Sequence, residues 1–378
     1  MNRISRRHFI RNTGAIAGGI IITRPAFTKA KTNQKPDQIV PEYRTLGKTG
    51  LKVTTVGYGA MRTTDAAVVE RALDLGINFV DTAHVYQGGN CEKMVGKVVS
   101  KRRKDVILCT KIKQDSEKDM IRMFEQSLRR LKTDYVDILY AHSMKKVDHI
   151  HNETTMNLFQ RFKKEGKVRY IGFSTHRNEA ALLNQAAEDR FWEVILVAYN
   201  FEKEKELTAA INKAANAGIG IVGMKTQAGG YETDTMGKLS PHQAALKWVL
   251  QNPNVHTTIP SMVTFDQLEE NIQVMGKKMG WNDRKILNKY AGGINDRYCR
   301  SCGACKDVCP HGVDIPEVNR CYMYADGYND LDLARINYRE LAVSENAAPC
   351  ENCEVCVARC KYGIALKDRM PRMNQLLA

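Results

Sequence analysis

The stretch "VILCTK" (106–111), read together with "VDILYAH" (136–142), decides the fold of this chain. Both runs are short and rich in apolar and β-branched residues, which is typical of buried strands. Between them lies a helical pattern whose apolar residues recur on one face: Ile121, Phe124, Leu128 and Leu131. A buried strand, an amphipathic helix and a second buried strand predict a parallel β/α unit.

The same alternation runs through most of the 378 residues. Six more β-rich runs are separated by helical stretches: "VTTVGYG" (53–59), "INFVD" (77–81), "VRYIGFS" (168–174), "VILVAYN" (194–200), "GIVGMK" (220–225) and "HTTIPS" (256–261). Eight consecutive units predict an α/β fold, a closed TIM-type (β/α)8 barrel over residues 42–290. The run "YRTLGKTGLKV" (43–53) is predicted to form a hairpin ahead of the barrel.

Polar side chains stand at the ends of most of these strands. The catalytic rim of such a barrel is formed by the carboxyl ends of its strands, so these residues are candidates for chemistry. The alternative for each one is a strand cap or a surface charge. The residues are Asp81, Lys111, His142, Ser174, Tyr199, Asn200, Lys225 and Ser261.

One block gives this rim a family resemblance. "NFVDTAHVYQGGNCEKMVGKVV" (78–99) resembles the signature of the aldo-keto reductase family, and "TKIK" (110–113) and "LYAHS" (139–143) match its Lys and His blocks. The resemblance covers about residues 42–275. It implies a catalytic tetrad of Asp81, Tyr86, Lys111 and His142. The alternative is a barrel that has kept the shape and lost the activity.

The chemistry of these residues suits carbonyl reduction, which needs hydride on carbon and a proton on oxygen. A phenol with a pKa near 10 is a poor acid at neutral pH, and a neighbouring ammonium lowers that pKa. Lys111 is expected to lower the pKa of Tyr86, with Asp81 holding Lys111 in place. His142 is expected to hydrogen-bond the carbonyl oxygen and to aid proton delivery.

The resemblance also implies an NAD(P)(H) site. Ser174 in "GFSTH" is expected to hold the nicotinamide amide, Tyr199 in "AYN" to stack on the nicotinamide ring, and Lys225 to face the pyrophosphate. The run "IPSMVTFDQLEEN" (259–271) aligns with the adenine-side block of the family. There the NADPH-selective members carry Lys and Arg anchors that are changed here, so NAD and NADP both stay open. The adenine-side residues are Ser261, Gln267, Glu270 and Asn271.

Eight of the eleven cysteines form the most specific motif of the chain. "CRSCGACKDVCP" (299–310) and "CENCEVCVARC" (350–360) share the spacing typical of two-cluster ferredoxins, in which the fourth cysteine binds the other cluster. This predicts two [4Fe–4S] clusters, and the alternatives are disulfides or zinc. The predicted ligands are Cys299, Cys302, Cys305 and Cys360 for one cluster, and Cys309, Cys350, Cys353 and Cys356 for the other.

The cysteine-rich region is predicted to form a small, mainly helical, ferredoxin-like domain over residues 291–378. Forty residues separate Cys309 from Cys350, which is more than a compact β-hairpin ferredoxin has. Within that gap, "IPEVNRCYMYADG" (315–327) and "DLDLARINYREL" (330–341) are predicted to be helices.

The amino-terminal run "SRRHFIRN" (5–12) resembles a twin-arginine export signal. The apolar segment at 14–23 is too short to span a membrane, so residues 1–30 are predicted to be a cleavable signal, 31–41 a linker, and the mature chain to lack a transmembrane span. That pathway carries folded proteins, which suits clusters assembled in the cytoplasm. The expected location is the periplasm or another extracytoplasmic space, and the twin-arginine machinery is an expected partner.

The net charge is +15, and the basic run "KRRK" (101–104) has no nucleic-acid motif around it, so it is expected to be a solvated loop. The favoured hypothesis is an exported oxidoreductase that interconverts a small carbonyl substrate and its alcohol, coupled to electron transfer through the clusters. A redox partner protein is then a candidate partner, and no nucleic-acid partner is expected. The alternative is an iron–sulfur electron-transfer protein whose barrel is a binding or docking body.

Overall fold

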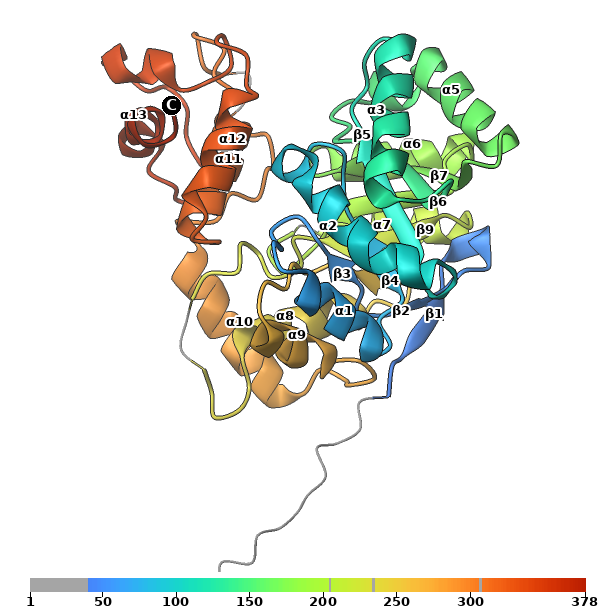
Figure 1. The fold of residues 1–378 in the computed structure, drawn as a ribbon. Coiled ribbons are helices and arrows are strands. Elements are labelled where there is room, and N and C mark those ends of the chain that lie inside the picture. Colours follow the sequence, from blue (N-terminus) through green and yellow to red (C-terminus); the bar gives the residue numbers. More distant parts are fainter. Residues whose placement is uncertain (1–39, 204, 233–234, 306–307) are drawn as a thin grey trace, which may run out of the picture. The chain divides into compact units, whose positions relative to one another are not determined.

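The computed structural model describes residues 40–203, 205–232, 235–305 and 308–378 (Figure 1). The predicted signal at 1–30 and nearly all of the predicted linker therefore lie outside the described residues. The first described elements form the predicted hairpin: β1 (Tyr43–Thr45) pairs antiparallel with β2 (Lys52–Thr54). Gly50 closes the turn in a left-handed conformation, with φ 73°, that suits a residue without a side chain.

Eight parallel strands form the barrel, in the spatial order of the sequence. They are β3 (Tyr58–Gly59), β4 (Phe79–Asp81), β5 (Ile107–Ile112), β6 (Val136–Ala141), β7 (Val168–Thr175), β8 (Val194–Ala198), β9 (Gly220–Met224) and β10 (Thr257–Thr258). Parallel bridges between Val56 and Thr258 and between Gly59 and Ser261 close the ring. The predicted fold class is confirmed.

The run "VTTVGYG" (53–59), predicted as one barrel strand, is divided between two elements. Its beginning, at Val53 and Thr54, belongs to the hairpin, whereas Tyr58 and Gly59 pair with the next barrel strand. The closing seam requires the glycine at position 59, since a Cβ there would lie 2.4 Å from the carbonyl oxygen of Ile259. The backbone of this short strand can thus approach the last strand closely enough to close the barrel.

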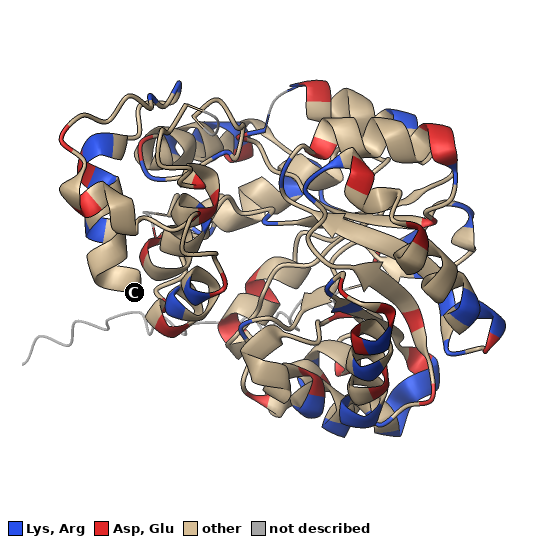
Figure 2. Cartoon of the chain, turned by 90° about the horizontal axis from the view of Figure 1, so that it is seen from above, with Lys and Arg blue, Asp and Glu red and all other residues tan. Residues whose placement is uncertain are grey.

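Helices surround the barrel, and most of them bury an apolar face in the barrel core. Figure 2 shows Lys and Arg interleaved with Asp and Glu along these helices. In the predicted basic loop, Arg102 pairs with Asp74 and Arg103 with Asp137. The helices are α1 (Ala66–Asp74), α2 (Asn90–Val99), α3 (Glu117–Leu131), α4 (Val147–Ile150), α5 (Glu153–Lys164), α6 (Glu179–Asp189), α7 (Lys205–Asn216), α8 (Pro241–Leu250), α9 (Phe265–Ile272) and α10 (Trp281–Ile294).

The carboxyl-terminal region is mainly helical, as predicted, with α11 (Ile315–Asp326), α12 (Leu331–Arg339) and α13 (Leu366–Leu377). These helices share an apolar core that includes Val318, Tyr338 and Met370 and that continues into Tyr290 of α10. Among the described helices, none combines the length and the apolar character needed to cross a membrane. The helical region is thus anchored on the barrel through a shared core.

Candidate active site

Side chains from three neighbouring strands meet in one cavity at the carboxyl end of the barrel. Asp81 ends β4, Lys111 lies near the end of β5, and His142 follows β6. Tyr86 begins the short 3-10 helix η2 (Tyr86–Gly89) that follows β4. All four line a cavity of about 890 Å³, a volume within the usual range for ligand sites. The structure thus brings the predicted tetrad together.

Lys111 and Asp81 form a buried ion pair beneath this cavity. The Nζ atom of Lys111 lies 2.5 Å from Oδ1 of Asp81 and donates a second hydrogen bond of 2.7 Å to the carbonyl oxygen of Thr82. Burial acts to lower the pKa of Lys111, but Asp81 and Tyr86 outweigh burial and raise it. The ammonium is therefore charged at neutral pH, and its position is fixed.

The Tyr86 phenol stands between this ammonium and His142. Lys111 Nζ lies 4.8 Å from the centre of the Tyr86 ring, and the Tyr86 and His142 ring centres are 5.8 Å apart, edge to face. Gln87, next in the chain, adopts φ 51° and donates hydrogen bonds to the carbonyl oxygens of Met61 and Thr63. These contacts hold the turn that presents the phenol.

The prediction that Lys111 lowers the pKa of Tyr86 below its ordinary value is wrong. Lys111 does act to lower it, as predicted, but burial acts in the opposite direction and is the larger effect. The result is a pKa raised to about 12. At neutral pH Tyr86 is therefore a neutral phenol that holds its proton.

His142 is neutral at physiological pH. Burial is the main cause that lowers its pKa well below 6.5, and the charges of Lys111 and Lys113 lower it further. Its Nδ1 atom is buried and has no hydrogen-bond partner in the part of the chain that the structure describes. A neutral imidazole has one N–H group, which suits it to donate a hydrogen bond to the oxygen of a carbonyl compound in the cavity.

Most of the residues predicted to contact a nicotinamide cofactor line the same cavity: Ser174, Lys225, Ser261, Gln267, Glu270 and Asn271. Several have fixed positions. Ser174 Oγ accepts a 2.8 Å hydrogen bond from the Ser143 amide, and Asn271 Oδ1 accepts one of 3.0 Å from Gln227. The hydroxyl of Thr226, also in the lining, is buried without a partner among the described residues. The lining therefore has polar groups available for a ligand.

Tyr199 is the exception among the predicted contacts. Its ring packs against Trp248, with ring centres 5.1 Å apart, and its hydroxyl lies 2.9 Å from the Thr208 hydroxyl. The side chain is buried in the core and is absent from the lining of the cavity, within the described residues. Its position gives no support to stacking on a ring bound at the mouth.

The cavity also contains residues from α11 that were not predicted from the sequence. Glu317, Arg320 and Tyr324 are spaced three and four residues apart, so they share one face of this helix, and all three line the cavity. Tyr328, just past the helix end, lies there too. The polar face of the helix predicted for "IPEVNRCYMYADG" was the one sequence feature that pointed to these residues. Nothing in the local pattern indicates that this face turns toward the barrel.

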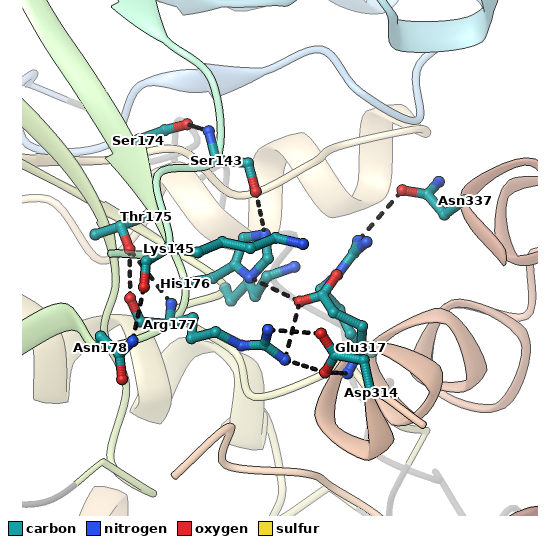
Figure 3. Close-up of polar contacts among 12 residues, drawn as sticks. Ser143, Lys145, Ser174, Thr175, His176, Arg177, Asn178, Asp314, Glu317 and Asn337 are labelled. Carbon is teal, nitrogen blue, oxygen red and sulfur yellow. Dashed lines mark hydrogen bonds and ion pairs between the residues drawn. The ribbon is translucent and has the colours of Figure 1, made fainter. Parts of the chain in front are cut away.

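A polar seam joins α11 to the loop after β7 (Figure 3). Figure 3 shows Arg177 pointing from that loop toward Asp314 and Glu317. Both guanidinium Nη atoms of Arg177 bind the Asp314 carboxylate, one of them at 2.7 Å. His176 Nε2 lies 3.1 Å from Ser143 Oγ, while its Nδ1 lies 3.7 Å from Glu317. These buried contacts place α11 over the barrel mouth.

The cysteines of the tail influence one another's pKa within two sets of four. Burial raises the pKa of Cys305 to about 12, and the facing thiols of Cys299, Cys302 and Cys360 raise it further. Burial likewise raises the pKa of Cys350 to about 11, together with three neighbouring thiols: Cys309, Cys356 and Cys353. Each set of four thiols therefore shares one neighbourhood, although it comes from two distant segments.

The thiols are free and do not converge on a single point. All eleven cysteines are unpaired, so the disulfide alternative has no support here. No group of three or more His, Cys, Asp or Glu side chains that could hold a metal ion is found within the described ranges. A hollow of about 30 Å³ lies among Cys309, Cys350, Cys353 and Cys356.

Comparisons with known proteins agree on the barrel. A sequence model of the aldo/keto reductase family matches residues 50–238. The uncharacterized oxidoreductase YqkF of Bacillus subtilis (strain 168) is 28% identical over 278 residues, 61% of this chain and 90% of that protein. L-galactose dehydrogenase of Arabidopsis thaliana is 41% identical over 154 residues, 35% of this chain and 48% of the plant enzyme. The solved aldo-keto reductase AKR11C1 from Bacillus halodurans, holo form, has a TM-score of 0.57 and 25% identity, covering 66% of this chain and 96% of that chain.

Proposed function

This chain belongs to the aldo/keto reductase family of oxidoreductases, and we propose that it reduces the carbonyl group of a small substrate, or oxidises the corresponding alcohol, at the barrel mouth. The observation that carries the proposal is the assembly of Asp81, Tyr86, Lys111 and His142 in one cavity. Family membership favours an enzyme over the alternative of a barrel that serves only as a docking body.

The proton chemistry follows from the charges of the site. Tyr86 holds a proton at neutral pH and is placed to donate it to the carbonyl oxygen. The phenolate left behind is stabilised by the Lys111 ammonium, which Asp81 holds in place. The neutral imidazole of His142 orients the carbonyl by a hydrogen bond. Burial of the site excludes water, which strengthens each of these interactions.

A nicotinamide cofactor would supply the hydride. The residues that fit it are the polar ones in the lining: Ser174 for the amide, and Ser261, Gln267, Glu270 and Asn271 for the adenosine half. Support comes from the volume of the cavity, from its unpartnered hydroxyl at Thr226, and from the family. NAD and NADP are both candidates. The block 261–271 carries neither Lys nor Arg for a 2′-phosphate, so it gives no support to a preference for NADP.

The test is nicotinamide-dependent turnover by the purified full chain. A panel of small aldehydes and ketones is offered with NADH and, separately, with NADPH, under anaerobic conditions, and the loss of reduced nicotinamide is followed by absorbance. We expect carbonyl-dependent oxidation of at least one of the two cofactors. Binding of neither cofactor by calorimetry would refute the proposal.

Two [4Fe–4S] clusters in the tail are the second part of the proposal. Support comes from the repeated cysteine spacing and from the two thiol neighbourhoods, each drawing on both segments. A cubane binds each thiolate to a different iron, so its ligands stand farther apart than those of a single ion. When bound, the clusters would supply one-electron transfer to or from a redox partner protein.

Export by the twin-arginine pathway to the periplasm or another extracytoplasmic space is the third part, and it rests on the sequence "SRRHFIRN" (5–12). A fusion of residues 1–41 to a fluorescent reporter that folds in the cytoplasm tests it. We expect the reporter outside the cytoplasm, and its retention when Arg6 and Arg7 are both replaced by Lys. Equal export of both fusions would contradict the proposed route.

A further inference from the structure

We propose that Lys225 and Tyr324 form a binding subsite for a carboxylate on the substrate, so that the enzyme prefers carbonyl compounds that carry an acidic group. This inference rests on the proposed function, because it concerns the ligand of the same cavity. Both side chains line that cavity, Lys225 from the loop after β9 and Tyr324 from α11. The subsite thus combines the barrel with the helical region.

The hydrogen bonds at Tyr324 leave its proton free for a ligand. Its hydroxyl oxygen accepts a hydrogen bond of 2.6 Å from Nη1 of Arg320 and one of 3.2 Å from Nζ of Lys225. Neither cation can accept a hydrogen bond. No acceptor for the phenolic proton is found among the described residues, and the side chain faces the cavity. The proton is therefore available to an acceptor in the cavity.

The subsite is held rigidly. The Tyr324 ring stacks on the ring of Tyr328, with centres 5.5 Å apart. Arg320 is fixed in turn by Glu317 at 2.9 Å and by Asn337 at 3.2 Å. Lys225 adopts φ 53°, a left-handed conformation that is costly for a residue with a side chain and that clusters at functional sites. Such fixed donors lower the entropic cost of holding a ligand.

The charged side chains in contact with Tyr324 are the cations Arg320 and Lys225. The Glu317 carboxylate is already shared by Arg320, Arg177 and His176. Lys225 and Lys145 both line the cavity, and neither belongs to an ion pair in the ranges that the structure covers, although the charge of Lys145 helps to lower the pKa of Glu317. Figure 3 shows the Lys145 side chain extending alongside His176. An anionic group of a ligand would supply the missing counter-charge.

The pKa of Tyr324 reflects the two cations that contact it. Burial acts to raise it, but Arg320 and Lys225 outweigh burial, and the pKa is lowered. The buried Tyr58 and Tyr298, by contrast, have raised pKa values, since burial dominates there. Tyr324 also lies near enough to Tyr86 for its charge to act on the Tyr86 pKa. Both phenols line the same cavity, so one ligand can contact Tyr86 through its carbonyl and Tyr324 through its carboxylate.

The same cations could serve a different anion, the pyrophosphate of the cofactor, and the experiment separates the two sources. Calorimetry on the full chain compares 4-(hydroxymethyl)benzoate with its neutral amide, and measures NADH and NADPH binding separately. The variants are Tyr324→Phe and Lys225→Met. The controls are Tyr322→Phe on the same helix and Lys213→Met, whose ammonium pairs with Glu188 on the surface. Thermal melting checks that each variant is folded.

We expect the carboxylate to bind more tightly than the amide, and this preference to fall by about tenfold or more in each variant but in neither control. Equal affinity for acid and amide would overturn the inference. So would variants that weaken cofactor binding while keeping the preference, since the anion would then be pyrophosphate. Turnover of 4-carboxybenzaldehyde and of the panel of neutral carbonyl compounds is assayed apart from binding. Selective binding without turnover of any of these compounds would refute the proposed function and leave this subsite standing.

Discussion

Tyr86 is the residue on which the proposed proton transfer depends. Replacing it by Phe keeps the ring between Lys111 and His142 and removes only the hydroxyl. We expect Tyr86→Phe to lower kcat for carbonyl reduction by about 100- to 10,000-fold, the usual contribution of a positioned acid. Steady-state kinetics measure this, with Tyr43→Phe as the matched control, because Tyr43 is exposed on the hairpin. A variant at position 86 with full turnover would exclude the phenol as the acid.

The raised pKa of Tyr86 sets the pH dependence of the two directions. Reduction needs the protonated phenol, which persists until the pH approaches about 12. Alcohol oxidation needs the phenolate as a base, so its rate is expected to rise with pH below that value. We therefore expect kcat for reduction to stay level from about pH 7 to about pH 10, while kcat for oxidation rises. A fall in reduction centred near neutral pH would assign the proton to another group.

At the scale of elements, the position of α11 depends on the buried pair of Arg177 and Asp314. Their side chains are 5% and 6% exposed, so removing one partner leaves the other charge buried without compensation. We expect Arg177→Met to lower the free energy of unfolding by roughly 3–5 kcal/mol. Denaturant unfolding of the full chain measures the effect.

The matched control for that pair is Arg161→Met. Arg161 pairs with Glu117 on the surface, where the two side chains are 44% and 52% exposed. Ion pairs of this kind contribute about 0–1 kcal/mol, so a small effect is expected. Equal losses in the two variants would show that burial of the Arg177 pair does not anchor α11.

At the scale of the whole molecule, the tail is predicted to carry about eight iron and eight sulfide per chain. Cys305→Ser is expected to remove about half of the iron, whereas Cys321→Ser is expected to keep it all, because Cys321 belongs to neither thiol group. Chemical analysis of protein purified without oxygen measures both. A colourless full-length protein without iron would refute the cluster proposal.

The crossed arrangement has its own test. Cys360 lies in the second segment, but its thiol neighbours Cys305 and Cys299. Cys360→Ser is therefore expected to lose the same electron paramagnetic resonance signal as Cys299→Ser, and to keep the signal lost in Cys350→Ser. Loss of the signal shared with Cys350 would indicate that each segment builds its cluster alone.

The strands and the polar residues at their ends could be predicted because their signals are local. A strand such as "VILCTK" carries its burial in its own composition, and strands in a β/α repeat bring their carboxyl ends to one rim. The first β-rich run was harder, since hairpin and barrel share it within a few residues. The net direction of the Tyr86 pKa shift was beyond sequence analysis, because burial depends on what packs over the phenol.

The sequence by itself determined the order of strands and helices, the residues at the barrel rim and the spacing of the cysteines, since each depends on neighbours within a few positions of the chain. Only the tertiary structure decided that α11 faces the cavity, that Tyr324 meets Lys225, and that Tyr199 is buried in the core. Arg177 and Asp314 are 137 positions apart. Contacts of that range arise from the packing of whole elements, and no local pattern of residue types encodes which faces will meet.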